Sequence, residues 1–567
     1  MNADLVIKNG KVITVDPDFS IKQAIAVKNG RILAVGSDGD MAQYITADTK
    51  VLDLKSKTIL PGINDSHMHG ASFGMARPPL SLDLSFPAVQ SISDMVDILK
   101  KKVDAVEKGE WIRGGGWDQG EIEECKHDPA RMPRKSDLDS VSPDNPVIFF
   151  DFSGHTLLVN SKALELAGVT KDTPDPPTGE IERDASGEPT GIFKEPGAMG
   201  EIFSVAPPPS KEQLRTAVLT NLTYLNANGI TSFTDAAVGP GGQDTFSNEI
   251  IDIYQELLTE GNLTTRVTVL LLLGNYGALT YEELENGIKN YTAPAGVDKN
   301  WLQFPGVKLF ADGIPLSYTS WMNEDYVSGD AGKGKSVIPG ETEEEQRKTL
   351  IEMVKLAHRH GYQVGIHATG DRAIDASIDG FVEAVKEGGG DLRHYIIHGD
   401  FVSPEGAKIL SRYNFGISMQ PYIQVKICDF EPTVVGEKRA AYEWPTRTVL
   451  DEDVKLTFSS DAPVTEPNWR LGVQAAVLRE GLASGKVSGP EQCVTVEEAL
   501  RAYTITGAWQ DGMETVKGSI EVGKVADFCV IGDDILSIDP HKIGEIPVLM
   551  TIVDGRIVFD ASIDQAS

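Results

Sequence analysis

Eight short apolar segments, spread from residue 58 to residue 461, are the feature that most restricts how this chain can fold. Each has the length and apolar content of a buried strand, and helix-like stretches lie between them. The segments are residues 58–63, 229–235, 266–273, 306–312, 362–367, 393–398, 415–420 and 454–461. Strands that alternate with helices indicate a parallel sheet, so we expect an α/β fold with a (β/α)8 TIM-like barrel.

Two capping patterns support the helices between these strands. Thr342 with Glu345 predicts a helix start, and apolar residues at helical spacing follow at Leu350, Met353, Val354 and Ala357, with Gly361 closing the helix. Thr495 with Glu498 predicts a second start that opens a helix over 499–509.

The two chain ends carry a different pattern, in which short alternating runs are separated by tight-turn signals. Asn9-Gly10 and Asn29-Gly30 near the start and Asp554-Gly555 near the end are typical of hairpins, because both residues of such a turn tolerate positive φ. Neither end can bury its apolar face alone, so we expect one β-sandwich built from residues 1–58 and 512–567. The barrel would then occupy 59–75 and 225–511, with an inserted cap subdomain, punctuated by proline at 173–178 and 207–209, over 76–224.

Histidines stand at the ends of several predicted strands. His67 and His69 follow the first, and in an extended chain residues two apart point the same way. His367 ends the fifth strand, His398 the sixth and Asp461 the eighth, so all five would meet at one rim of the barrel. Each alone can be read as a capping or loop-bonding residue, but together they predict a divalent-metal site.

Composition excludes several classes of partner. A formal net charge of -32 repels nucleic acid and anionic membranes, and it is explained by solubility or by a salt-rich habitat. Four scattered cysteines without Cys-x-x-Cys spacing suggest neither a disulfide framework nor a thiolate zinc site. The first residues lack a basic and then apolar leader, and the longest apolar run, 267–273, is too short to span a bilayer. We expect a soluble cytoplasmic protein.

Along nearly its whole length the chain resembles the metal-dependent amidohydrolase superfamily, and within it amidohydrolase family 3, the branch with N-substituted formamide deformylases. The matching motifs are 60–69 (LPGINDSHMH), 116–118 (GWD), 153–155 (SGH) with 160–161 (NS), 307–313 (VKLFADG), 367–371 (HATGD), 460–463 (SDAP) and 518–527 (GSIEVGKVAD). The resemblance implies one or two divalent ions, usually zinc with Mn2+ or Fe2+ as alternatives, bound by His67, His69, His367, His398 and Asp461.

In members with two metals a carboxylated lysine or a glutamate often bridges the ions. Lys308 is the first candidate, since an uncharged lysine can react with carbon dioxide; the alternative is an ion pair with Asp312 or another carboxylate nearby. Glu195 is a rival ligand.

For the reaction, we expect a metal-activated water as nucleophile, with Asp461 moving its proton to the leaving nitrogen. His155 is the candidate oxyanion donor, or else a satisfied histidine inside the insertion, and Asp371 either supports a ligand or caps a helix.

We expect a small-molecule substrate and hydrolysis of a non-peptide C–N bond in an amide or an N-formyl or N-acyl amine. Deamination, lactone, ester or cyclic-amide hydrolysis and peptidase activity are the enzymatic alternatives, and a non-catalytic scaffold is a third. Aromatic residues expected near strand ends or in the cap suit an aromatic or apolar amide, or else belong to the core: Trp117, Phe149, Phe150, Tyr318, Trp321, Tyr422 and Trp444. A homodimer is a family-level expectation.

Overall fold

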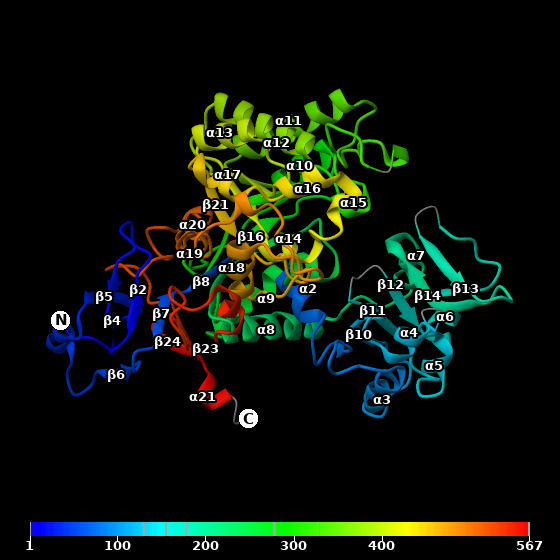
Figure 1. The fold of residues 1–567 in the computed structure, drawn as a ribbon, viewed down its shortest axis with the longest axis horizontal. Helices are drawn as coiled ribbons and strands as arrows, with labels where there is room; N and C mark the ends of the chain where they lie inside the picture. The colour runs from blue at the N-terminus through cyan, green and yellow to red at the C-terminus, as the bar shows by residue number, and fades with distance from the viewer. Residues whose placement is uncertain are drawn as a thin grey trace. The chain divides into compact units, whose positions relative to one another are not determined.

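The computed structural model describes residues 2–128, 131–152, 156–176, 179–275, 279–327 and 329–564. The chain divides into two compact units (Figure 1). One joins Met1–Gly70 to Asn221–Ser567, and the other is Ala71–Thr220. The insertion therefore folds on itself, and we describe each unit separately.

The first unit is organised around eight parallel strands, which confirms the predicted barrel. In sheet order the strands follow the sequence from one side to the other, so each connection crosses over through a helix. They are β8 (Ile63–Met68), β15 (Ile230–Val238), β16 (Arg266–Leu271), β17 (Leu302–Phe310), β18 (Gln363–Ala368), β19 (Tyr395–His398), β20 (Gly416–Met419) and β21 (Lys455–Phe458). Every residue of β8, β15 and β16 is buried, as expected of strands covered on both faces.

The first and last strands, β8 and β21, approach each other through hydrogen bonds just beyond their C-terminal ends. The Asp461 amide donates to the His67 carbonyl at 2.9 Å, and the His69 amide donates to the Ala462 carbonyl at 2.7 Å. The ring of strands therefore comes together where the predicted ligands stand.

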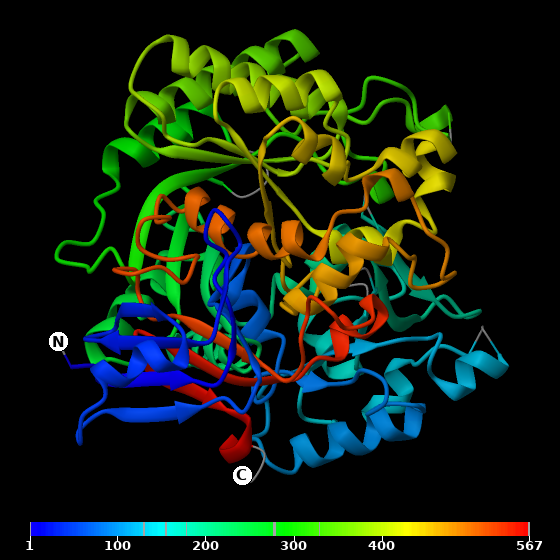
Figure 2. The same cartoon turned by 60° about the vertical axis from the view of Figure 1, so that its left-hand side comes forward.

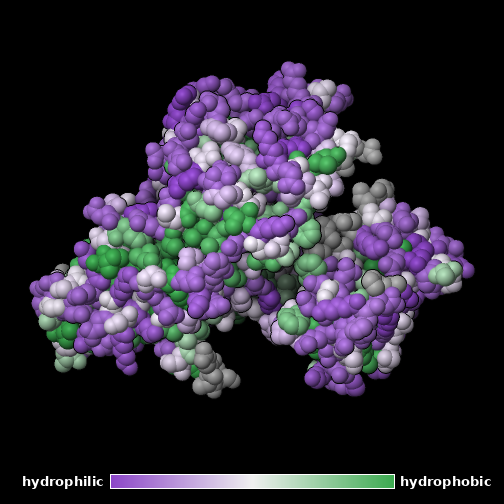
Figure 3. Space-filling model, in the orientation of Figure 1, coloured by the Kyte–Doolittle hydropathy of each residue, from purple (hydrophilic) through white to green (hydrophobic). Residues whose placement is uncertain are grey.

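Helices cover the outside of the barrel. The main ones are α9 (Asn248–Glu260), α10 (Tyr281–Asn290), α11 (Glu343–Arg359), α12 (Asp371–Lys386), α13 (Pro404–Arg412), α14 (Pro421–Ile427), α15 (Glu431–Val435), α16 (Glu437–Tyr442), α17 (Thr446–Asp451), α18 (Trp469–Leu478), α19 (Val496–Ala502) and α20 (Ile505–Gln510). Thr342 caps α11 by accepting from the Glu345 amide, and the four predicted apolar residues of this helix are buried. The outward surface around α11 and α13 is hydrophilic (Figure 3). The capping box of Thr495 and Glu498 is also present, but the chain breaks at Thr504, so the single helix predicted over 499–509 is wrong.

Two smaller sheets, ordered β5-β4-β1-β6 and β24-β23-β22-β7-β2-β3, complete the first unit. Their strands are β1 (Leu5–Lys8), β2 (Lys11–Ile13), β3 (Ile21–Lys22), β4 (Ala24–Lys28), β5 (Arg31–Gly36), β6 (Lys50–Asp53), β7 (Thr58–Pro61), β22 (Phe528–Ile531), β23 (Val548–Val553) and β24 (Arg556–Asp560). N-terminal and C-terminal strands run side by side in the second sheet (Figure 2), because β22 pairs with β7. A shared apolar core includes Ile7, Ile25, Ile59, Phe528 and Ile552, which confirms a sandwich built from both chain ends.

Two local sequence predictions in this region are wrong. The run over 58–63 is not one strand: β7 belongs to the sandwich and β8 to the barrel, with Gly62 between them. A Cβ at Gly62 would collide with the Thr231 side chain, so the crossing needs a residue without one. Asn9-Gly10 does not form a hairpin, because β1 and β2 lie in different sheets, whereas Asn29-Gly30 and Asp554-Gly555 do connect paired antiparallel strands.

The second unit has its own six-stranded sheet, ordered β13-β14-β12-β11-β10-β9. Its strands are β9 (Leu82–Asp83), β10 (Ile112–Trp117), β11 (Val147–Asp151), β12 (Thr156–Val159), β13 (Glu180–Arg183) and β14 (Pro189–Lys194), accompanied by α3 (Ile92–Val103), α4 (Glu123–His127), α5 (Lys135–Asp139), α6 (Ser161–Ala167) and α7 (Glu195–Phe203). Leu99, Trp117 and Phe149 belong to its buried core. Among the described residues of both units, no helix combines the length and apolar character that crossing a membrane requires.

Candidate metal centre

His67, His69 and Asp461 meet at the C-terminal end of the barrel. One donor atom of each lies within 4.8 Å of the other two. His67 Nε2 is 3.3 Å and His69 Nε2 is 3.5 Å from Asp461 Oδ1. His67 lies on β8, and His69 is the first residue after this strand. Their i, i+2 spacing places both rings on one side of the chain, with ring centroids 5.3 Å apart. This is a compact nitrogen and oxygen donor set of the kind that divalent cations bind.

Asp65 fixes the position of this group. Its buried carboxylate accepts from the Ser460 amide at 3.0 Å and from the His67 amide at 3.4 Å, which ties β8 to the segment that carries Asp461. Burial raises the pKa of Asp65 to about 7, although the hydrogen bonds from Ser460 oppose this. Asp461 itself has a φ of 54°, a backbone conformation that costs free energy and is typical of functional sites.

His398 and His367 extend the group along the same rim. The His398 ring centroid is 5.7 Å from that of His67 and 4.5 Å from that of His367. His398 ends β19 with a φ of 76°, and its Nδ1 is 2.8 Å from Gln420 Oε1. His367 Nε2 is 2.9 Å from the Gly313 carbonyl. The structure therefore places all five predicted ligands in one neighbourhood.

In His69 and His398, one ring nitrogen contacts a neighbouring oxygen, and the other keeps a lone pair that a metal could use. His69 Nδ1 lies 3.1 Å from the Ala236 carbonyl, so it carries the proton and Nε2 stays unprotonated. By the same argument His398 keeps its Nε2 lone pair, because Gln420 Oε1 can only accept. Burial is the main cause that lowers the pKa of His67 to about 3 and of His367 to about 4, with the Lys308 charge adding to it.

Asp461 completes the protonation pattern that a metal requires. Burial alone would raise its pKa, but the neighbouring His67 and His69 outweigh burial and hold the pKa well below its usual range. Neutral imidazoles and an ionised carboxylate are the forms that bind a cation, so the residues present fit a divalent ion.

Lys308 lies beside this group on β17. Its side chain is 1% exposed, and its Nζ is 3.5 Å from His67 Nε2. Burial lowers its pKa to about 7, with the Asp461 charge opposing. Among the described residues no carboxylate lies within ion-pairing distance of Nζ; Asp312, the expected partner, instead accepts from the amides of Trp321, Thr369 and Gly370.

Other predicted site residues have different outcomes. His155 lies outside the described residues, and so does the side chain of Glu195. Asp371 Oδ1 accepts from the amides of Asn323 and Arg372, which anchors the loop after β17 to the start of α12. Of the seven aromatic residues, Trp117 and Phe149 are core residues of the second unit.

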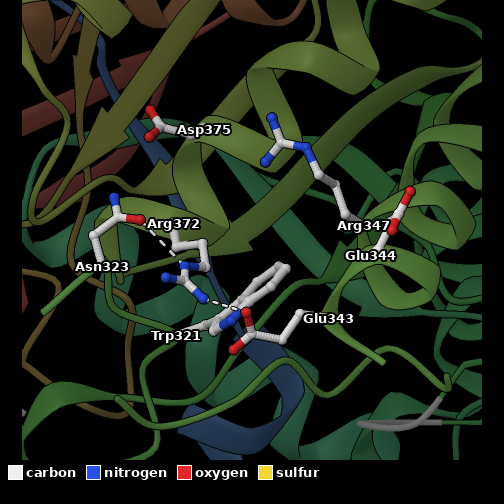
Figure 4. Close-up of a pocket in the computed structure, with 7 residues that line it drawn as sticks. All are labelled: Trp321, Asn323, Glu343, Glu344, Arg347, Arg372 and Asp375. Carbon is white, nitrogen blue, oxygen red and sulfur yellow. Dashed lines mark hydrogen bonds and ion pairs between the residues drawn. The ribbon is translucent and has the colours of Figure 1, made fainter. Parts of the chain in front are cut away.

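One surface pocket of about 360 Å³ is lined by residues from the starts of α11 and α12 and from the loop after β17 (Figure 4). Its lining residues are Trp321, Asn323, Glu343, Glu344, Arg347, Arg372 and Asp375. Arg372 pairs with Glu343, and Arg347 pairs with Asp379. Both cations are therefore satisfied within the protein, and the pocket contains none of the candidate ligands.

Sequence reasoning missed the supporting residues Gln420 and Asp65. Each had a usable signal, since Gln420 directly follows a barrel strand and Asp65 lies on the same strand as His67. A polar residue on a strand that carries a predicted ligand, or at the end of a neighbouring strand, is a candidate hydrogen-bond partner for that ligand.

Comparison with known proteins identifies the family of the chain. The model of the amidohydrolase family matches residues 50–559. YtcJ of Bacillus subtilis (strain 168) is 27% identical over 524 residues, covering 92% of both chains. The N-substituted formamide deformylase of Arthrobacter pascens is 27% identical over 563 residues, covering 98% of both. The fold is similar to an uncharacterized metal-dependent hydrolase from Pyrococcus horikoshii OT3, with a TM-score of 0.73 and 24% identity over 95% of this chain and 99% of the other. The family match spans most of the sequence, and the chain belongs to the amidohydrolase family of metal-dependent enzymes.

Proposed function

We propose that the protein hydrolyses a non-peptide C–N bond in an amide or an N-formyl or N-acyl amine. The observation that carries the proposal is the convergence of His67, His69 and Asp461 within 4.8 Å, with His367 and His398 on the same rim. The relation to an N-substituted formamide deformylase over 98% of both chains supports the amide class. The expected ion is zinc, with Mn2+ or Fe2+ as alternatives. The homodimer and the cytoplasmic location stay predictions.

The roles of the chain's own residues follow from their protonation. A divalent ion bound here would supply Lewis-acid activation of water and of the substrate carbonyl. His67, His367 and His398, whose pKa values are lowered chiefly by burial, would hold the ion together with His69 through imidazole lone pairs. Asp461 is ionised at neutral pH, so its carboxylate can accept a proton from the attacking water and then donate it to the leaving nitrogen.

Asp461→Asn tests this role directly. The substitution keeps the shape of the side chain but removes its basicity, so we expect turnover per bound ion to fall about 10²- to 10⁴-fold, the range of general acid–base catalysis, while the four histidines still hold metal. The assay combines metal quantification with a screen of N-formyl and N-acyl amines, in which carboxylate plus amine marks amide hydrolysis and ammonia marks deamination. Asp371→Asn, which changes a carboxylate outside the centre, is the matched control. Undiminished turnover would remove Asp461 from proton transfer.

We further propose that Lys308 carries a carbamate that bridges two ions. The Nζ lone pair would attack carbon dioxide, forming an N–C bond and releasing one proton to solvent. Burial and the lack of a carboxylate partner among the described residues support this, since an unpaired buried ammonium is costly. We expect a carbamate signal in the 13C spectrum of protein prepared with 13C-labelled bicarbonate, absent from Lys308→Met. A full complement of two ions in Lys308→Met would contradict the bridge.

A further inference from the structure

Three acidic residues on the first unit are buried together, and we name Asp400, Glu431 and Glu443 the acid cluster. Asp400 lies two residues beyond the candidate ligand His398, Glu431 begins α15, and Glu443 directly follows α16. Their exposed fractions are 2%, 0% and 0%. Carboxylates are rarely buried this completely without a partner.

Backbone contacts bring the three segments together. The Trp444 amide donates to the Asp400 carbonyl at 2.8 Å, so the residue after Glu443 is bonded to the loop that carries Asp400. The Tyr442 hydroxyl donates to the Val402 carbonyl at 2.9 Å, which holds α16 to the same loop. After burial, the charges of Glu431 and Asp400 are the causes that keep the pKa of Glu443 well above its usual range. The three carboxyl groups therefore lie close enough together to hinder one another's ionisation.

The oxygens of the cluster lack counterparts within the described part of the chain. Asp400 Oδ1 and both oxygens of Glu431 and of Glu443 accept no hydrogen bond there. Arg479, whose charge reaches Glu443, donates instead to the backbone carbonyls of Ser488, Trp444 and Glu443 at 2.7, 3.0 and 2.8 Å. Buried polar atoms without partners call for an explanation, and a bound ion is one of them.

We propose that the acid cluster binds a cationic group of the substrate, an ammonium or guanidinium, while the metal centre holds the amide to be cleaved. This rests on the hydrolase function proposed above. It narrows the substrate class to amides whose amine or acyl part carries a second, positively charged group. Asp400, two residues after His398, links the acid cluster to the strand that carries this candidate ligand.

The spacing of the acids favours an organic cation over a metal ion. Among the described residues, the donor atoms that all lie within 4.8 Å of one another belong to His67, His69 and Asp461, and the acid cluster does not meet that spacing. A metal requires oxygens at about 2.3–2.6 Å, whereas a guanidinium presents five donors over a wider plane.

The neighbouring wall is apolar and aromatic. Tyr326 and Phe401 pack with Met322, Val434 and Val435 in one buried group. Burial, followed by the charges of Asp312 and Glu431, raises the pKa of Tyr326 above its usual range, so the ring stands near the cluster. Aromatic faces beside carboxylates are a setting that binds organic cations.

Binding is measured first on the metal-loaded enzyme, by calorimetry and thermal shift. n-Butylguanidinium is compared with n-butylurea, which has the same shape without the charge, and with potassium and caesium chloride. We expect binding of the guanidinium that weakens at least about tenfold in Glu431→Gln and Glu443→Gln, because a buried charge pair is lost. Glu437→Gln, an exposed acid on the adjacent helix α16, should bind as the unmodified protein does.

The second arm measures kcat/KM for N-formyl-1,4-diaminobutane and for N-formylpentylamine, which is similar in length but uncharged. We expect the charged substrate to be preferred at least about tenfold, and the preference to disappear in Glu443→Gln. Guanidinium binding without hydrolysis of either amide would refute the proposed function but not the cluster. If both formamides are hydrolysed at equal rates and guanidinium does not bind, the cation site is refuted while the hydrolase function stands. The cation site is refuted as well if n-butylurea or potassium binds as tightly as n-butylguanidinium.

Discussion

The barrel contains two buried groups of histidines that look alike in composition but differ in how their nitrogens are used. In the metal centre, His69 and His398 each direct one ring nitrogen to a carbonyl oxygen and leave the other free. In the second group, the Val364 amide donates to His394 Nδ1, His394 Nε2 is 2.8 Å from His358 Nδ1, and His358 Nε2 is 2.7 Å from the Gly388 carbonyl. That chain of bonds uses every ring nitrogen of the pair.

The difference shows that hydrogen-bond partners, and not the residue type, separate a ligand from a structural histidine. His358 and His394 have no lone pair left for a metal, so their burial serves only the chain of hydrogen bonds. Position along a strand already separates the groups in part: His398 stands at the C-terminal end of β19, while His394 precedes its first residue, Tyr395. In a barrel the C-terminal end is where reactive groups meet.

The largest expected effect comes from exchanging one histidine in each group. His67→Asn removes a ligand, so we expect bound metal to fall below about a tenth of the normal content, since disturbing a ligand's partner alone costs 10- to 100-fold in affinity. His394→Asn should keep its metal and lose thermal stability instead. Metal analysis and thermal unfolding of both variants test this. Loss of metal in His394→Asn, or full metal content in His67→Asn, would show that hydrogen-bond partners do not separate ligand histidines from structural ones.

A smaller effect is expected from Gln420→Leu. The leucine fills the same space but cannot accept from His398 Nδ1, so the ring is no longer held in the ligand tautomer. We expect metal affinity to fall about 10- to 100-fold, measured by competition with a chelator. Gln363→Leu is the matched control, because Gln363 also donates to buried carbonyls, those of Arg393 and Gln510, but touches no ligand. Equal losses in both variants would show a general effect of a buried amide.

Much of the fold was predictable because each barrel strand is a continuous apolar run, and the ligands could be located because they stand where such runs end. Sheet membership was harder: the segments around Gly62 and Asn9-Gly10 read locally as one strand and one hairpin, yet long-range pairing assigns their halves to different sheets. Glu431 and Glu443 gave no signal at all. An acid in or next to a short helix is usually solvated, and only the packing of distant segments makes these two buried.

The pH dependence of stability gives the smallest effect. Burial, followed by the charge of His358, lowers the pKa of His394 to about 3 from an ordinary value of 6.5. Protonation is therefore easier in the unfolded chain, so the stabilisation is complete above pH 6.5 and is lost as pH falls from 6.5 toward 3. At about 1.4 kcal/mol per pH unit, protonation of His394 should lower the free energy of unfolding by about 2 kcal/mol between pH 7 and pH 5.

His394→Gln can still accept from Val364 and donate to His358 but does not titrate. Its loss of stability on acidification should be smaller than that of the unmodified protein by this amount, measured by denaturant unfolding at both pH values. The charged groups elsewhere are common to both proteins and cancel in the difference, so parallel curves would mean that the His358–His394 chain accepts a proton without breaking.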